Sequence, residues 1–487
     1  MISEFSRRHF ARLAGLAALG ASLPAGAAEK KQATMRFAPA PFPKGFVWGT
    51  ATSSYQIEGA VNEDGRGPSI WDTFSHTADK IADHSNGDRA NEHYYRYKED
   101  VQLIKALGVK AYRFSIAWPR VFPQGSGAPN PKGLDFYNRL IDELLANGVE
   151  PYATLYHWDL PQALEDRVGG WRSSETSKAF GDYSGYVAAR ISDRVRNIFT
   201  LNEAGRFLNF GYGWGIDAPG LKLPTGELNQ ARHNVVLGHG LAVQAIRAAA
   251  RKGTKVGMAE NIAACVPAFA TPEHIRATEM ATRELNAGLL GVTLEGKYTD
   301  GFLEYSGKDA PKFTPEELKI IGSKTDFVGL NIYAPQFYIA ASDKKPGWDV
   351  LPFPSSFPHM NSEWLRIGPE VIYWTPKIAA KIWNIDTIYI SENGTSSEDK
   401  LRDNGKVYDL DRISFLRNYL TQLQRATAEG VPVKGYFLWS LMDNFEWIFG
   451  YEKRFGVYHV DFQTQARTPK LSAAFYRDVV ARNAIGP

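Results

Sequence analysis

The sequence contains one cysteine, Cys265, in 487 residues. A disulfide within the chain and a cysteine-based metal cluster are therefore excluded. The sequence also lacks a strong excess of either charge, because its formal net charge is +3 at pH 7. Nucleic acids and anionic membranes attract strongly basic surfaces, so we expect neither as a partner. No histidine pair has the helical spacing of metal ligands, and we expect no metal or other cofactor.

The apolar run near the N-terminus is too short to anchor the chain in a membrane. It covers residues 13–23, follows Arg7 and Arg8, and precedes the small residues of the stretch AGA at 25–27. This order is typical of a secretory signal peptide, with an unstructured tail as the alternative. The stretch SRRHF at 6–10 resembles the twin-arginine export motif.

This resemblance implies a periplasmic protein that meets the twin-arginine export machinery and crosses the inner membrane in the folded state. A chain that needs no disulfide suits that route. We expect residues 1–28 to be a cleaved signal peptide, residues 29–41 a linker, and residues 42–487 a single domain.

Short apolar runs alternate with longer amphipathic ones along the rest of the chain. The apolar runs predict eight strands, at residues 46–52, 111–118, 150–158, 197–203, 255–262, 326–333, 387–393 and 433–441. Helix-period segments between them include residues 91–107, 134–146, 174–194, 229–251 and 412–429. This alternation favours parallel pairing, and eight units predict a closed (β/α)₈ TIM barrel with long loops at the carboxyl ends of the strands. An open doubly wound sheet is the alternative.

The longest stretch without a periodic pattern covers residues 334–369 and is rich in proline, serine and tryptophan. In a barrel it would follow the sixth strand, on the face where barrel enzymes have their sites. We expect an irregular loop that shapes the outer part of a cleft.

Two glutamates stand at the ends of predicted strands. Glu203 follows Asn202 at the end of the fourth strand, and Glu392 precedes Asn393 at the end of the seventh. Either glutamate alone would most simply be a surface or salt-bridged residue, but the ends of all barrel strands meet on one face. Hydrolysis of a glycoside needs one carboxylic acid to protonate the leaving oxygen and one carboxylate to attack or to activate water. The pair therefore predicts a glycosidase.

The sequence resembles glycoside hydrolase family 1, the β-glucosidase type of retaining barrel, over nearly all of residues 42–480. The motifs that carry the resemblance are FVWGTATSSYQIEG at 46–59, YRFS at 112–115, LYHWDLP at 155–161, ENG at 392–394 and WSLMDNFEW at 439–447. The resemblance implies a β-glucosidase that releases terminal glucosyl residues from oligosaccharides or from aryl and alkyl glucosides. Galactose or fucose as the preferred sugar stays an alternative.

The resemblance also implies a role for each matching residue. Glu203 matches the acid/base and Glu392 the nucleophile, while Arg113 and Tyr333 match the groups that orient the nucleophile. The residues that match sugar contacts are Gln56, His157, Trp158, Asn202, Tyr333, Trp439, Glu446 and Trp447. Trp439 has the alternative of a plain core residue, and His157 taken alone would more often be a buried histidine with its hydrogen bonds satisfied.

The chain departs from the family pattern directly after the acid/base. The family usually has proline and then an aromatic or similar residue there, whereas this sequence has Ala204 and Gly205. Proline would bias the preceding glutamate toward extended backbone angles, and alanine does not. A replacement of Ala204 by proline would be tolerated if the backbone is family-like, and harmful if the Ala204 N–H donates a needed hydrogen bond.

Three other functions are weighed against the glycosidase. A 6-phospho-β-glycosidase would need cations near the sugar O6, where Glu446 would instead repel phosphate. An exported sugar-binding protein without activity would need neither Glu203 nor Glu392. A nucleotide-binding enzyme is suggested by GVTLEGK at 291–297, but Tyr298 replaces the serine or threonine that holds Mg²⁺ and no suitable strand precedes it.

Overall fold

The computed structural model describes residues 41–486. The predicted signal peptide at 1–28, and the predicted linker except its last residue, lie outside the described residues.

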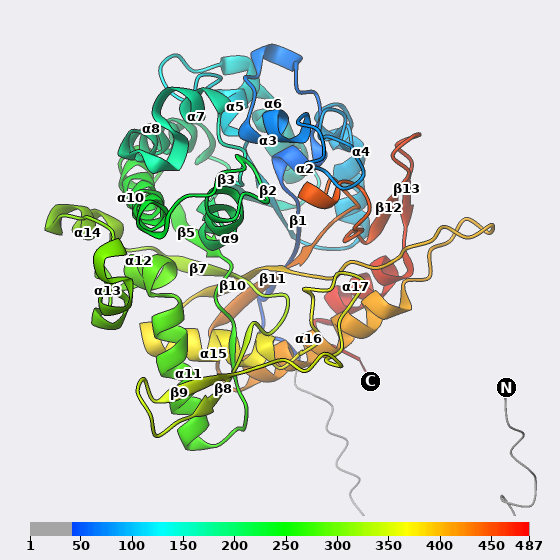
Figure 1. Cartoon of the computed structure of the whole chain (residues 1–487). Coiled ribbons are helices and arrows are strands. Elements are labelled where there is room, and N and C mark those ends of the chain that lie inside the picture. Colours follow the sequence, from blue (N-terminus) through cyan, green and yellow to red (C-terminus); the bar gives the residue numbers. More distant parts are fainter. Residues whose placement is uncertain (1–40, 487) are drawn as a thin grey trace, which may run out of the picture. The chain divides into compact units, whose positions relative to one another are not determined.

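Eight parallel strands close into a barrel in the order β1-β11-β10-β7-β5-β4-β3-β2 (Figure 1). The strands are β1 (Val47–Ala51), β2 (Ala111–Ser115), β3 (Glu150–Tyr156), β4 (Asn197–Asn202), β5 (Lys255–Glu260), β7 (Phe327–Asn331), β10 (Ile388–Asn393) and β11 (Val433–Trp439). Each lies inside a predicted range, and β1 pairs in parallel with both β2 and β11. The TIM barrel is confirmed, and an open sheet is excluded.

Helices cover the outside of the barrel (Figure 1). The longer ones are α4 (His93–Ala106), α6 (Pro131–Ala146), α8 (Ser174–Ile191), α10 (Thr225–Ala249), α11 (Pro272–Leu285), α15 (Val371–Trp383), α16 (Leu410–Ala428) and α17 (Leu471–Arg482). The shorter ones are α2 (Ser54–Ile57), α3 (Ile70–Ser75), α5 (Trp118–Val121), α7 (Gln162–Val168), α9 (Ala204–Phe207), α12 (Val292–Glu295), α13 (Asp300–Ser306) and α14 (Pro315–Ile321). In α6, the buried residues Tyr137, Leu140, Ile141 and Leu144 recur at helical spacing, which gives this helix one apolar face.

Aromatic side chains fill the barrel interior. Tyr152 of β3 contacts Tyr389 of β10 and Phe437 of β11, with ring centroids 5.8 and 5.0 Å apart. Phe327 of β7 contacts both Tyr389 and Phe199 of β4. These strands lie on different sides of the barrel, so the rings form a packed layer across it. The guanidinium of Arg113 on β2 lies 5.0 Å from the centroid of the Phe199 ring. The aromatic layer therefore lies directly against this predicted site residue.

The prediction of an irregular loop over 334–369 is wrong for its first half. Strands β8 (Phe337–Ala341) and β9 (Trp348–Leu351) pair with each other, and β8 also pairs with β6 (Cys265–Pro267). This small sheet lies beside α11 (Figure 1). Most of β9 is exposed, so its residues show no alternation of buried and polar positions that would indicate a strand.

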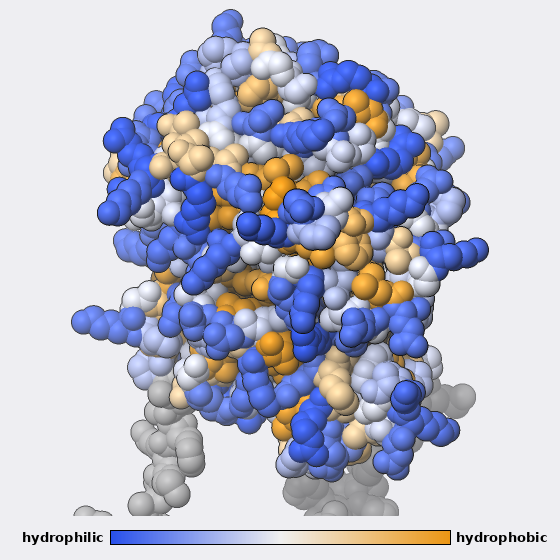
Figure 2. Space-filling model, turned by 90° about the vertical axis from the view of Figure 1, so that its left-hand side faces the viewer, coloured by the Kyte–Doolittle hydropathy of each residue, from blue (hydrophilic) through white to orange (hydrophobic). Residues whose placement is uncertain are grey.

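The face of the molecule in Figure 2 carries mainly hydrophilic side chains, with hydrophobic ones in scattered groups between them.

Two further short strands, β12 (Tyr458–Val460) and β13 (Arg467–Pro469), pair in the C-terminal region. Within residues 41–486, no helix combines the length and the apolar composition needed to cross a membrane.

Candidate active site

Glu392 stands at the end of β10 and is held by two neighbours. The Arg113 Nη1 donates to Glu392 Oε1 at 2.7 Å, and the Tyr333 hydroxyl donates to Glu392 Oε2 at 2.7 Å. Both members of the Arg113–Glu392 ion pair are buried. Each carboxylate oxygen thus has its own donor, which fixes the plane of the group and favours its ionised form.

Arg113 connects three strands of the barrel. Besides Glu392, its guanidinium donates to Asn202 Oδ1 at 2.6 Å, to Thr154 Oγ1 at 3.0 Å and to the Ser391 carbonyl at 3.2 Å. A planar guanidinium with all its arms engaged has little freedom to move. Strand β2 is therefore fixed relative to the three strands that carry these partners, β3, β4 and β10.

Glu203 directly follows β4 and is 5% exposed. Its backbone has φ +52° and ψ +60°, the left-handed region that side chains other than glycine seldom adopt. The Asn331 amide donates to Glu203 Oε1 at 2.8 Å. The unusual backbone angles turn the chain out of the strand at this residue, and such outliers cluster at active sites.

The two glutamates differ in what surrounds them. Burial, and then the negative charge of Glu392, raise the pKa of Glu203 to about 8. Burial also raises the pKa of Glu392, but Arg113 and the Tyr333 hydroxyl act to lower it. Glu203 has no such ion pair with a guanidinium in the described part of the chain. Of the two, Glu392 ionises first and Glu203 keeps its proton to higher pH.

Asn331, at the end of β7, links the two glutamates, and its role was not predicted. Its amide donates to Glu203 and, at 3.1 Å, to Asn202 Oδ1. As a hydrogen-bond partner it also lowers the pKa of Glu392. Its side-chain oxygen accepts from the Ser391 hydroxyl at 2.7 Å. The sequence signal was its place at the end of the sixth predicted strand.

Gln56 is buried in α2 and binds the loop that follows β11. Its amide nitrogen donates to Asn444 Oδ1 and the Phe445 carbonyl, both at 2.9 Å, and lies 3.3 Å from Glu446 Oε2. Burial raises the pKa of Glu446 to about 8, against the lowering effect of the Arg206 guanidinium. The fold thus brings together Gln56 and Glu446, which are separated by 390 positions in the chain.

His157 and Asn202 are also brought together. The Asn202 amide lies 3.1 Å from His157 Nε2, and burial together with Arg113 holds the pKa of His157 well below its usual range. His157 is therefore neutral at ordinary pH. With Nε2 accepting from Asn202, the proton is on Nδ1, which has no hydrogen-bond partner among residues 41–486.

Three tryptophans surround His157. The ring of Trp439 lies parallel to it at 5.6 Å, Trp447 at 6.0 Å, and Trp158 tilted at 5.5 Å. The Trp158 indole N–H already donates to the Asn202 carbonyl at 3.0 Å, so this N–H supports Asn202 and is engaged before any ligand arrives. Trp439 and Trp447 present flat apolar rings next to polar groups, the combination that suits the face of a sugar.

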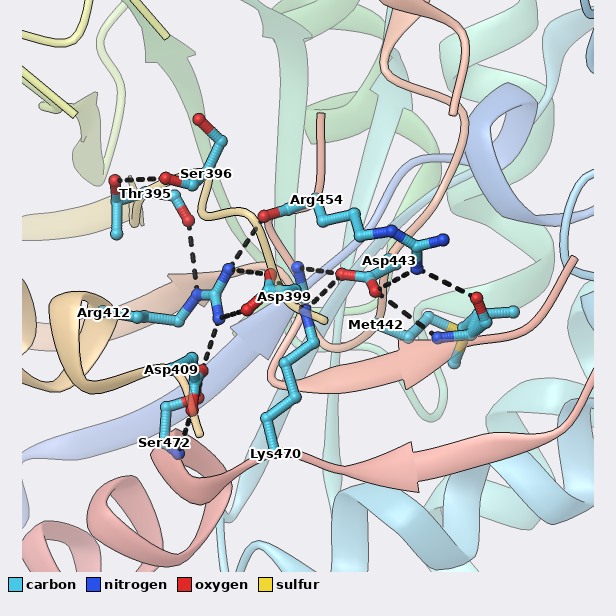
Figure 3. A network of polar contacts seen from close by, with 12 residues as sticks. Thr395, Ser396, Asp399, Asp409, Arg412, Met442, Asp443, Arg454, Lys470 and Ser472 are labelled. Atoms are coloured by element: carbon cyan, nitrogen blue, oxygen red, sulfur yellow. Dashed lines mark hydrogen bonds and ion pairs between the residues drawn. The ribbon is translucent and has the colours of Figure 1, made fainter. Parts of the chain in front are cut away.

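A buried ionic network holds the loop between Trp439 and Trp447 (Figure 3). Lys470 donates to Asp443, within this loop, and to Asp399 at 2.7 Å. Arg412 donates to Asp399 through both arms of its guanidinium, and Arg454 donates to Asp443 at 2.8 Å. Asp443, Asp399, Arg412 and Lys470 are all buried. The network ties the loop that carries Glu446 to α16 and to the start of α17.

The segment after Glu203 binds a third buried glutamate. The Ala204 N–H donates to Glu260 Oε2 and the Gly205 N–H to Glu260 Oε1, both at 2.9 Å. Glu260 ends β5 and is buried, and burial raises its pKa to about 7. Of the two outcomes considered for Ala204, the structure shows the one in which its N–H donates a hydrogen bond.

All predicted site residues lie at the carboxyl end of the barrel or in the loops that follow its strands, but this placement does not test their individual roles. Across residues 41–486, no cluster of three or more histidine, cysteine, aspartate or glutamate side chains could hold a metal ion. The segment 291–297, considered for nucleotides, lies around α12 and does not follow a strand.

Comparison with known proteins gives consistent results. Residues 38–485 match the family model described as glycosyl hydrolase family 1. The beta-glucosidase A of Acetivibrio thermocellus is 43% identical, over 91% of this chain and 98% of its own. A bifunctional beta-D-glucosidase/beta-D-fucosidase of Bifidobacterium breve is 41% identical, over 90% and 98%.

Among solved structures, the beta-glucosidase of Thermotoga maritima in complex with glucoimidazole superimposes with a TM-score of 0.83 at 41% identity. The match covers 91% of this chain and 99% of that one. The predicted glycoside hydrolase is confirmed, and this chain belongs to glycosyl hydrolase family 1.

Proposed function

We propose that the protein is a retaining β-glucosidase in which Glu203 is the acid/base and Glu392 the nucleophile. The observation that carries the proposal is the difference between two neighbouring buried carboxyl groups. Glu392 has an ion pair with Arg113, whereas Glu203 has a neutral amide partner and a pKa raised to about 8. One group is thus prepared to attack as an anion and the other to donate a proton.

In the first step, Glu203 gives its proton to the glycosidic oxygen while Glu392 attacks the anomeric carbon. The bond to the leaving group breaks, and a covalent bond forms between the sugar and Glu392. Arg113 and Tyr333 hold the attacking carboxylate in place. Because Glu392 loses its negative charge on attack, the pKa of Glu203 falls, which prepares it for the second step.

In the second step, Glu203 acts as a base. It takes a proton from water, and the water oxygen attacks the anomeric carbon and displaces Glu392. Two displacements return the sugar in its original anomeric configuration. Retaining enzymes have their carboxyl groups about 5–5.5 Å apart. Asn331 binds Glu203 through its amide and Ser391, the residue before Glu392, through its oxygen, so both carboxylates lie around one side chain.

We infer glucose as the preferred sugar from the relatives named beta-glucosidase, which cover nearly the full chain. Gln56, Glu446, His157 and Asn202 provide the polar contacts, and Trp439 the stacking surface. Fucosidase activity is the second candidate, supported by the relative from Bifidobacterium breve.

The test is hydrolysis of nitrophenyl β-glucoside, β-galactoside and β-fucoside by the purified protein, with the first-formed anomer observed by proton NMR. We expect the β-glucoside to have the highest kcat/KM and the β-anomer of glucose to appear first. An α-anomer formed first would contradict the retaining mechanism. A purely sugar-binding protein would release no nitrophenol.

We further propose that residues 1–28 direct the protein to the periplasm by the twin-arginine route. The support is the sequence alone: Arg7 and Arg8, the apolar run at 13–23 and the small residues at 25–27. Replacing both arginines by lysine should leave uncleaved protein in the cytoplasm. Normal delivery of that variant to the periplasm would contradict the proposal.

A further inference from the structure

Glu260 is a buried carboxylate close to the acid/base that the mechanism above does not use. It lies at the end of β5, adjacent to β4, whose end carries Glu203. Among the described residues, the hydrogen-bond partners of its carboxylate are the backbone N–H groups of Ala204 and Gly205, at 2.9 Å each. A buried carboxylate is costly unless its oxygens are satisfied, so this arrangement needs an explanation.

The position of Glu260 depends on the two residues at which the chain departs from the family pattern. Proline has no backbone N–H, so a family member with proline after the acid/base could not make the bond that Ala204 makes. Gly205 allows the close approach of the second oxygen: a Cβ there would lie 3.3 Å from Glu260 Oε1 and 3.3 Å from Leu289 Cδ1. Ala204, Gly205 and Glu260 therefore form one unit.

This unit acts on the backbone of Glu203 itself. The Glu203 N–H donates to the Ala259 carbonyl at 2.8 Å, one residue before Glu260. Glu203 is thus tied to β5 on its own N–H and through the next two N–H groups. Three consecutive bonds to one strand end fix the left-handed turn at Glu203, and so the direction of its side chain.

We propose that Glu260 is a positioning residue for the acid/base, holding the turn at 203–205 in place of the proline found in the family. The proposal rests on the function proposed for Glu203. It assigns Glu260 no contact with substrate. Its effect is on where the Glu203 carboxyl group points and on the charge beside it.

The charges around Glu203 give the proposal a second readout. The charged groups that act on it are Glu392 from β10, Arg206 from α9 and Glu260 from β5. The Tyr333 hydroxyl is a further titratable neighbour. Glu392 and Glu260 raise the pKa of Glu203, and Arg206 lowers it. Removing the charge of Glu260 should therefore lower the pKa of Glu203, and the alkaline limb of the pH profile should move to lower pH.

The experiment compares two glucosides in wild type and Glu260→Gln. Phenyl β-glucoside needs protonation of its leaving group, and 2,4-dinitrophenyl β-glucoside needs little. Glutamine keeps the size but can accept through one atom only, so the turn loosens. We expect kcat/KM to fall about 10–100-fold more for the phenyl than for the dinitrophenyl substrate, a part of the roughly 10²–10⁴-fold effect of an acid catalyst.

Asp100→Asn is the matched control, because Asp100 is a buried carboxylate of α4 that bonds Arg467 and His93. Loss of the Asp100 charge should lower the melting temperature and leave the ratio of kcat/KM for the two glucosides as in wild type. If Glu260→Gln does not fold, Gly205→Ala is the second variant. It keeps both N–H groups and the charge of Glu260, but its added methyl group displaces the Glu260 carboxylate. It should change the ratio of kcat/KM for the two glucosides in the same direction by a smaller factor.

If Glu260→Gln changes kcat/KM by the same factor for both glucosides and leaves the alkaline limb of the pH profile unmoved, the proposed role of Glu260 is overturned. The ratio and the pH limb test Glu260, whereas wild-type activity tests the proposed function. A wild type that hydrolyses neither glucoside would overturn the proposed function, and this inference with it.

Discussion

Arg113 and Glu392 form a 2.7 Å ion pair in which the guanidinium is 1% and the carboxylate 4% exposed. A buried carboxylate without a cation would hold its proton, and a protonated carboxyl group is a poor nucleophile. The pair therefore does more than orient Glu392, because the guanidinium lowers the pKa of a carboxyl group whose burial raises it.

Replacing Arg113 by methionine should therefore raise the pKa of Glu392, and the acid limb of kcat/KM should move to higher pH by about one unit or more. The free energy of unfolding should fall by about 3–5 kcal/mol, because the change leaves the buried Glu392 carboxylate without its charged partner. Arg113→Lys is the control, because it keeps the positive charge and loses only the planar guanidinium with its several N–H donors. Its acid limb should move less. An unmoved acid limb in Arg113→Met would show that the pair does not set the charge of Glu392.

The pH profile of the wild type should have its alkaline limb near pH 8. Glu203 must carry a proton in the first step, and its pKa is raised to about 8. Activity on a substrate with a poor leaving group is thus retained through neutral pH and falls as Glu203 ionises. The measurement is kcat/KM for phenyl β-glucoside from pH 4 to 10. A fall that is complete below pH 6 would mean that Glu203 has an ordinary pKa.

Ala204→Pro should destabilise the protein. The change removes the N–H that donates to Glu260, and a proline ring disfavours helical angles in the residue before it, where Glu203 has φ +52°. An unsatisfied buried group costs about 1–3 kcal/mol, which a thermal melt can detect. Ala204→Gly keeps the N–H and is the control. A melting temperature equal to or above that of the control would indicate a family-like backbone instead.

Lys470 should be essential for the loop that carries Asp443. Lys470→Met leaves the buried carboxylates of Asp399 and Asp443 without this cation, and we expect a loss of about 3–5 kcal/mol. The KM should rise as well, because Asn444 and Glu446 follow Asp443 in the same loop.

The control for this change is Arg482→Met, which breaks the exposed pair with Asp478. Exposed pairs contribute about 0–1 kcal/mol, so its melting temperature should stay close to that of the wild type. Similar melting temperatures for Lys470→Met and Arg482→Met would show that the buried network around Lys470 does not stabilise the fold more than an exposed ion pair does.

The barrel and its two central glutamates could be predicted from the sequence because both depend on local patterns. Eight apolar runs have strand length, and Glu203 and Glu392 come at the ends of two of them. A barrel brings all such ends to one face, so the topology alone placed two residues 189 positions apart in the same site.

The supporting contacts could not be predicted, because they join residues that no local pattern connects. Glu260 lies inside the predicted strand 255–262, but only the fold shows that its oxygens meet the N–H groups of Ala204 and Gly205, more than 50 positions earlier. Lys470 and Asp399 are 71 positions apart, and no motif of the sequence analysis connects them. The mostly exposed strand β9 has no buried face to reveal it.

The most direct test of the proposed mechanism is to trap the nucleophile. A 2-deoxy-2-fluoro-β-glucoside with a good leaving group should inactivate the enzyme with a stoichiometry of one, because the fluorine slows the second displacement more than the first. Mass spectrometry of the digested protein should then find the fluoroglucosyl group on Glu392. A label on any other residue, or no covalent label despite turnover of β-glucosides, would contradict the assignment of Glu392 as the nucleophile.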